Sequence, residues 1–121
     1  MTTAVRFRLA LALALAVLVT AAPAAAHVGV KSYSPKRGST VARSLERVKV
    51  KFKGRITDGR LTVTGPSGSK VSIGDGSVVG RKRVLRVRLR GGLARGRYRV
   101  SMRVLHTDGH VRSKSWSFNL R

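Results

Sequence analysis

Apolar and polar residues alternate along most of the chain after residue 27. In an extended strand, this alternation places the apolar side chains on one face and the polar side chains on the other. No useful stretch shows the helical period of about 3.6 residues. The pattern therefore predicts about seven short strands, near residues 28–33, 48–52, 61–64, 71–73, 85–90, 98–104 and 115–120.

Residues typical of turns separate these runs. Glycine, proline, serine and aspartate gather at positions 35–39, 58–59, 65–68, 74–76, 91–92, 96 and 108–109. Such residues supply positive φ angles, fixed φ angles or local side-chain hydrogen bonds, so they favour reversals of the chain. About seven strands at this spacing predict an all-β fold, either an Ig-like two-sheet sandwich or a small Greek-key barrel.

Residues 1–26 have the composition of an export signal. Two arginines precede an unbroken apolar run over residues 9–19, and Ala24 and Ala26 form the small-residue pattern that signal peptidase accepts. The alternative is a retained membrane anchor, but the run of 11 apolar residues is shorter than the roughly 20 that span a bilayer. We expect a signal helix that is cleaved after Ala26, which leaves residues 27–121 as one exported domain in the periplasm or cell envelope.

Charge and cysteine content narrow the possible chemistry. The chain has 26 Lys and Arg, only 4 Asp and Glu, a net charge of +22 and no cysteine. The missing cysteines exclude a disulfide framework, a thiolate nucleophile and a cysteine-ligated zinc site. Four carboxylates also leave little room for an enzyme that needs a carboxylate pair.

The basic charge predicts attraction to polyanions. Loss of residues 1–26 would leave a net charge of +20, which attracts nucleic acid, acidic cell-wall polymers or anionic lipids. We expect no specific nucleic acid partner, because the aromatic residues occupy inward strand positions rather than a base-stacking platform. These residues are Phe52, Tyr98, Trp116 and Phe118.

His27 would be the first residue of the exported chain. A terminal histidine can chelate a metal through its α-amine and its ring Nδ1 together, whereas an internal histidine has only an amide nitrogen beside its ring. A free α-amine has a pKa of about 8, so a tightly bound metal displaces its proton at neutral pH. The terminal position thus predicts two nitrogen donors from one residue.

Asp108 and His110 form a second candidate pair, separated by Gly109. Side chains two residues apart in extended chain point to the same side, and glycine allows the tight backbone that brings both heads together. Asp-Gly is also a strong signal for a two-residue hairpin turn, in which these side chains would have no chemical role. The presence of a terminal His27 in the same chain makes us prefer the metal-ligand interpretation.

Together, His27, Asp108 and His110 offer three nitrogens and one carboxylate oxygen. This donor set suits a tetragonal Cu(II) ion, and Cu(II) also leads the affinity order of the divalent metals. Cu(I) prefers thiolate and thioether donors, but the chain has no cysteine and Met102 stands at an inward strand position. We predict one Cu(II) ion per chain and no separate Cu(I) site.

The motifs also occur in a characteristic order. They are Ala-x-Ala before His27, Ser-x-Ser-Pro-x-x-Gly-Ser at 32–39, a strand ending in Phe52, Leu-x-x-Gly-x-Tyr-x-Val at 93–100, Asp-Gly-His at 108–110 and a last strand with Phe118. In this order the chain resembles the CopC family of exported copper-resistance proteins. The resemblance implies a cupredoxin-like Greek-key β-barrel or sandwich that binds one Cu(II) ion through His27, Asp108 and His110.

Three places depart from the pattern of the family that the chain resembles. Lys53 and Gly54 stand where the family often has an acidic residue near the copper, Met102 replaces a tryptophan, and His106 replaces a serine. His106 has the same strand parity as Asp108, so it is a candidate partner of the ligands or an alternative ligand.

These observations predict a protein that handles copper rather than an enzyme. We expect an exported, monomeric Cu(II)-binding protein for copper sequestration, delivery or resistance, with the copper ion and a separate membrane copper transporter as partners. The alternatives are a copper-dependent oxidase and a basic exported module that binds anionic cell-envelope polymers.

Overall fold

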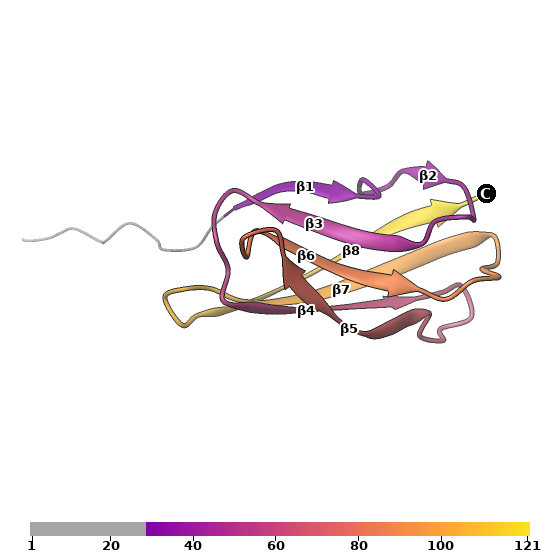
Figure 1. Cartoon of the computed structure of the whole chain (residues 1–121). Helices are drawn as coiled ribbons and strands as arrows, with labels where there is room; N and C mark the ends of the chain where they lie inside the picture. Colours follow the sequence, from indigo (N-terminus) through magenta and orange to yellow (C-terminus); the bar gives the residue numbers. More distant parts are fainter. Residues whose placement is uncertain (1–28) are drawn as a thin grey trace, which may run out of the picture.

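The computed structural model describes residues 29–121, in which eight β-strands form two sheets (Figure 1). The strands are β1 (Val30–Ser34), β2 (Thr40–Val41), β3 (Arg47–Phe52), β4 (Asp58–Thr64), β5 (Ser72–Val79), β6 (Val84–Leu89), β7 (Gly96–Leu105) and β8 (Val111–Leu120). Within this range there is no helix of the length and apolar character needed to cross a membrane. The expected signal helix and its cleavage point lie outside the described residues.

Each sheet has four strands. One sheet has the order β1-β3-β6-β5 and is antiparallel throughout. The other has the order β2-β8-β7-β4, in which β2 runs parallel to β8 and the other neighbours are antiparallel. The predicted all-β sandwich is therefore confirmed. The seven expected strands are all present, and the eighth is β2, whose two residues are too few to show alternation.

The hydrophobic core lies between the two sheets. Most of its buried members come from the inward positions of the alternating runs, as the pattern predicted, while Ile56 and Leu93 join it from loops. The aromatic members are Phe52, Tyr98, Trp116 and Phe118, each no more than 6% exposed. Their burial confirms that they belong to the core and form no exposed stacking platform.

The longest strand pair, β7 with β8, is regular over its whole length. It runs without a register shift from Gly96 opposite Leu120 to Leu105 opposite Val111. The pair is anchored at its far end by Tyr98, whose hydroxyl donates a hydrogen bond of 2.6 Å to the carbonyl oxygen of Ala94. This regular pairing places the turn that connects β7 and β8, residues 106–110, at one end of the sandwich.

The alternation misassigned one position. It placed Ile73 inward beside Val71, but Ile73 is 51% exposed, whereas Ser72 is buried. Val71 and Ser72 are both buried, so the alternation of faces is broken where β5 begins, and the pairing of Ser72 with Leu89 and of Ile73 with Arg88 turns Ile73 outward. A separate register shift between β5 and β6 follows, between Ile73 and Ser77. The Ser72 hydroxyl accepts a hydrogen bond of 3.0 Å from the Val63 backbone N–H, which satisfies both buried groups.

Candidate metal centre

The turn between β7 and β8 has a compact, defined geometry. The Gly109 N–H donates to the carbonyl oxygen of His106, and the His106 N–H donates to the carbonyl oxygen of His110, both at 2.9 Å. Gly109 has a φ of +88°, in the left-handed region. These features describe a three-residue hairpin loop with a type I turn and a glycine in the bulge position. The Asp-Gly signal thus marks a hairpin turn, one residue longer than the two-residue form.

This turn brings Asp108 and His110 together. Asp108 Oδ1 accepts a hydrogen bond from the His110 backbone N–H, and Asp108 Oδ2 lies 2.9 Å from His110 Nδ1. The Asp108 side chain is 19% exposed and the His110 side chain is 71% exposed. The two interpretations of this motif are therefore compatible, because the turn itself places the two side chains in contact.

The contact between these two side chains is a hydrogen bond, with His110 Nδ1 and Asp108 Oδ2 separated by 2.9 Å. A histidine that binds a metal through one ring nitrogen commonly engages a carboxylate through the other. The turn therefore brings together one carboxylate and one imidazole, which are the donor types that would hold the predicted metal.

His106 lies at the base of the same turn. It is 4% exposed and lines a pocket of ≈ 240 Å³ between the sheets. Other residues of that pocket are Gly29 and Phe52 on the first sheet's side, and Met102 on β7. His106 continues the inward positions of Met102 and Val104 on β7, whereas Asp108 and His110 are exposed, so the alternation that placed His106 with the two ligands ends at the turn.

His27 lies outside the described residues, and Gly29 is the first residue that the structure describes. Gly29 lines the pocket that contains His106, and its carbonyl oxygen accepts a hydrogen bond of 2.9 Å from the Lys53 N–H. Figure 1 shows the beginning of β1 and the β7–β8 turn at the same end of the sandwich.

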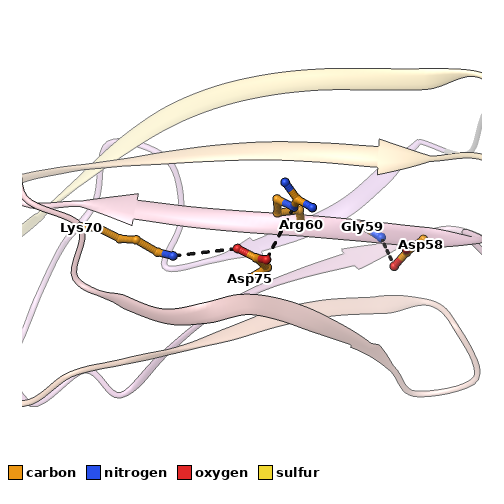
Figure 2. A network of polar contacts seen from close by, with 5 residues as sticks. All are labelled: Asp58, Gly59, Arg60, Lys70 and Asp75. Atoms are coloured by element: carbon orange, nitrogen blue, oxygen red, sulfur yellow. Dashed lines mark hydrogen bonds and ion pairs between the residues drawn. The ribbon is translucent and has the colours of Figure 1, made fainter.

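Two of the four carboxylates, Asp58 and Asp75, take part in other contacts (Figure 2). Asp58 accepts a hydrogen bond of 2.8 Å from the Gly59 N–H. Asp75 lies 3.9 Å from both Arg60 Nε and Lys70 Nζ, and its side chain is 61% exposed. Both residues line a hollow together with Leu105 and Val111, which flank the β7–β8 turn. Exposed ion pairs such as those of Asp75 contribute little stability.

Among residues 29–121, no group of three or more histidine and carboxylate side chains is arranged to hold a metal ion. Within that range the turn offers a pair of donors, Asp108 and His110.

A comparison with known protein families identifies the family of this chain. A family model described as the CopC domain matches residues 30–121. The chain belongs to the CopC domain family. The family suggested by the order of motifs is thereby confirmed.

Solved structures agree with this assignment. The CopC domain of this chain is similar to CopC from Methylosinus trichosporium OB3b, with 27% sequence identity and a TM-score of 0.65, covering 78% of this chain and 93% of that one. It is also similar to PcoC from Escherichia coli, described as a methionine-rich copper resistance protein, with 25% identity and a TM-score of 0.61, covering 78% and 99% of the two chains. No match was found among the curated proteins.

This CopC domain differs in composition from a methionine-rich protein. The chain has two methionines, of which only Met102 lies in the matched region, and Met102 is 5% exposed. The pocket that Met102 and His106 share was not foreseen from the sequence. The available signal was that both residues occupy the inward positions of one strand run.

Proposed function

We propose that this chain is an exported Cu(II)-binding protein that sequesters or delivers copper. Cleavage after Ala26 exposes His27, whose α-amine and ring join Asp108 and His110 around one Cu(II) ion. Membership of the CopC domain family supports a role in copper handling, since the similar protein from Escherichia coli is described as a copper resistance protein.

The observation that carries this proposal is the contact of Asp108 with His110 in the β7–β8 turn. It provides one hard oxygen and one nitrogen at a spacing of 2.9 Å. The described chain begins at Gly29, against the pocket that extends to the base of this turn. In the sequence, His27 precedes Gly29 by two residues, and the start of β1 lies at the same end of the sandwich as this turn (Figure 1).

The donor chemistry favours the oxidised metal. Three nitrogens with one carboxylate oxygen suit tetragonal Cu(II), while Cu(I) requires softer donors. Met102, the one thioether in the matched region, is buried between the sheets. Bonds to the ligands govern affinity here, because charges beyond about 8 Å are screened at physiological salt.

The test uses the exported form that starts at His27. Titration with Cu(II), followed by calorimetry and EPR, should give one ion per chain and a tetragonal, nitrogen-rich spectrum. A variant with one extra residue before His27 should lose affinity by more than about 100-fold, because loss of a ligand exceeds the 10–100-fold typical of outer partners. Asp108→Asn and His110→Ala should show similar losses.

Asp75→Asn is the matched control for Asp108→Asn, because it removes an exposed carboxylate that already pairs with Arg60 and Lys70. It should bind copper as the unmodified protein does. Full-affinity binding by the extended protein would refute the role of the amine. Equal losses in Asp75→Asn and Asp108→Asn would show that charge, rather than ligation, controls binding.

A further inference from the structure

Basic side chains cover the centre of the outer face of the β1-β3-β6-β5 sheet. We call the five residues Arg47, Lys49, Lys51, Arg86 and Arg88 the basic face. The first three alternate with buried residues on β3, and the other two alternate with buried residues on β6. In the register of these strands, Arg47 lies opposite Arg88, and Lys49 lies opposite Arg86.

These opposed cations are not balanced within the fold. Like charges directly opposite each other on neighbouring strands destabilise a sheet. Within residues 29–121, no ion pair involves a member of the basic face. The other sheet offers a contrast, because Arg60 lies opposite Arg103 but has the Asp75 carboxylate 3.9 Å away. A bound anion would relieve the repulsion that the basic face carries.

The margins of the basic face combine hydroxyl and apolar groups. Ser32 and Ser34 on β1 lie opposite Lys51 and Lys49. On the other side of the face, Ile73 on β5 lies opposite Arg88 and is 51% exposed.

The half-buried Val84 lies opposite Lys51, at the other end of β6 from the Arg88 that pairs with Ile73. An exposed apolar group beside a cluster of cations has no partner on a hydrophilic polymer, but it does have one among lipid headgroups and acyl chains.

The shape of the basic face also distinguishes the possible partners. The cations form a two-dimensional array over two adjacent strands rather than a line along a groove. Binding sites for single-stranded nucleic acids combine a basic groove with aromatic platforms, whereas the aromatic side chains Phe52, Tyr98, Trp116 and Phe118 are buried here. An array of this kind presents several cations to a plane of anions at once.

We propose that the basic face docks the protein onto an anionic lipid surface. The cations attract the headgroup phosphates, the serines hydrogen-bond to them, and Ile73 contacts the apolar boundary. The candidate metal ligands Asp108 and His110 belong to the turn of the other sheet, so lipid docking and copper binding can be measured independently.

The experiment measures co-sedimentation of residues 27–121 with vesicles, either pure phosphatidylcholine or phosphatidylcholine with about one-third phosphatidylglycerol. We expect binding only to the anionic vesicles and a decrease with added salt. The double variant Lys49→Gln/Arg86→Gln should bind about 30-fold more weakly, since each basic residue near such a surface contributes about fivefold. Ile73→Ser should weaken binding by about fivefold through loss of apolar contact.

The matched control is Arg97→Gln/Arg99→Gln, which makes the same change in net charge on β7 of the other sheet. It should weaken vesicle binding by less than about threefold, because distant charges are screened. Thermal unfolding confirms that every variant is folded, and Cu(II) titration should be unchanged in all of them.

Three results would overturn the proposal. Equal losses in the two double variants would show that net charge, not the basic face, drives binding. Binding to phosphatidylcholine alone would remove the role of the cations. Tight binding to soluble polyphosphate with no binding to anionic vesicles would identify a polymer partner instead.

Discussion

Gly109 provides a sensitive test of whether the β7–β8 turn holds the metal. It has a φ of +88°, and a Cβ added to it would meet no atom within 4 Å. Gly109→Ala therefore introduces backbone strain without a steric clash. Its Asp108 and His110 neighbours keep all their donor atoms, so any loss of copper affinity must come from geometry.

Gly68 is a closely matched control. It also has a φ of +88° with no atom within 4 Å, and its N–H donates to Gly65 at 2.9 Å, just as Gly109 donates to His106. A left-handed conformation costs an L-residue about 1–2 kcal/mol, offset partly by about 0.4–1 kcal/mol of reduced freedom in the unfolded chain. Both alanine variants should thus lose about 1 kcal/mol of stability, or roughly 4–8 °C in Tm.

Only Gly109→Ala should weaken copper binding. The strained turn relaxes when no metal is present, and copper must then restore the geometry that brings Asp108 to His110. The affinity loss is bounded by the strain relieved, which corresponds to about 5–10-fold for about 1–1.4 kcal/mol. Unfolding followed by the fluorescence of Trp116, the single tryptophan, gives the stability, and calorimetric Cu(II) titration gives the affinity.

Gly109→Asn supplies a rescue, since asparagine tolerates the left-handed region better than alanine. It should recover most of the affinity. The reasoning fails if Gly109→Ala binds Cu(II) as tightly as the unmodified protein while losing the expected stability. It also fails if Gly68→Ala loses as much copper affinity as Gly109→Ala.

Three further predictions concern the fold and its metal. Ser72→Ala should lower the free energy of unfolding by about 1–3 kcal/mol, because the buried Val63 N–H loses its acceptor; a urea titration measures this, and a loss below about 0.3 kcal/mol would contradict it. Tyr98→Phe should cost about 0.5–1.5 kcal/mol in the same assay through loss of the bond to Ala94, and an unchanged midpoint would show that the bond contributes nothing. Free Cu(II) at 100 times its Kd should stabilise the exported form by about 2.7 kcal/mol in thermal unfolding, and an equal gain in Asp108→Asn would show that copper binds elsewhere.

Alternation predicted the strands and the core well because each strand has one buried and one solvated face. The aromatic residues Tyr98, Trp116 and Phe118 followed this rule and are buried. Turn residues predicted several reversals, including the one at Asp108 and Gly109. The turns expected at residues 58–59 and 74–76 were wrong, because these residues lie within β4 and β5, and the chain instead reverses between β5 and β6 at residues 80–83. Alternation does not specify which strands pair, because every strand offers the same kinds of face to its neighbours.

The errors arose where local contacts override the alternation. Val71 and Ser72 are buried in succession at the start of β5, which leaves Ile73 outward, and Ser72 can occupy an inward position because its hydroxyl satisfies the Val63 N–H. β2 was not predicted, because its two residues are too few to show an alternation of apolar and polar positions. It is defined by its parallel pairing of Thr40 and Val41 with the end of β8.

The candidate metal centre was predictable in part. The spacing of Asp108 and His110 around Gly109 indicated their contact, which the turn geometry explains. The burial of His106 depends on how the two sheets meet, which the sequence does not encode locally. The contribution of His27 stays a prediction that the copper titrations test.

The irregular β5 also affects how this edge of the sheet can pair. β5 is an edge strand, and its register shift interrupts the straight row of backbone groups that an incoming strand from a second molecule would need. Asp75, on that strand, adds a charge at the interruption. In a chain without cysteine, and therefore without disulfide cross-links, these two features make β5 a poor template for pairing with a second copy.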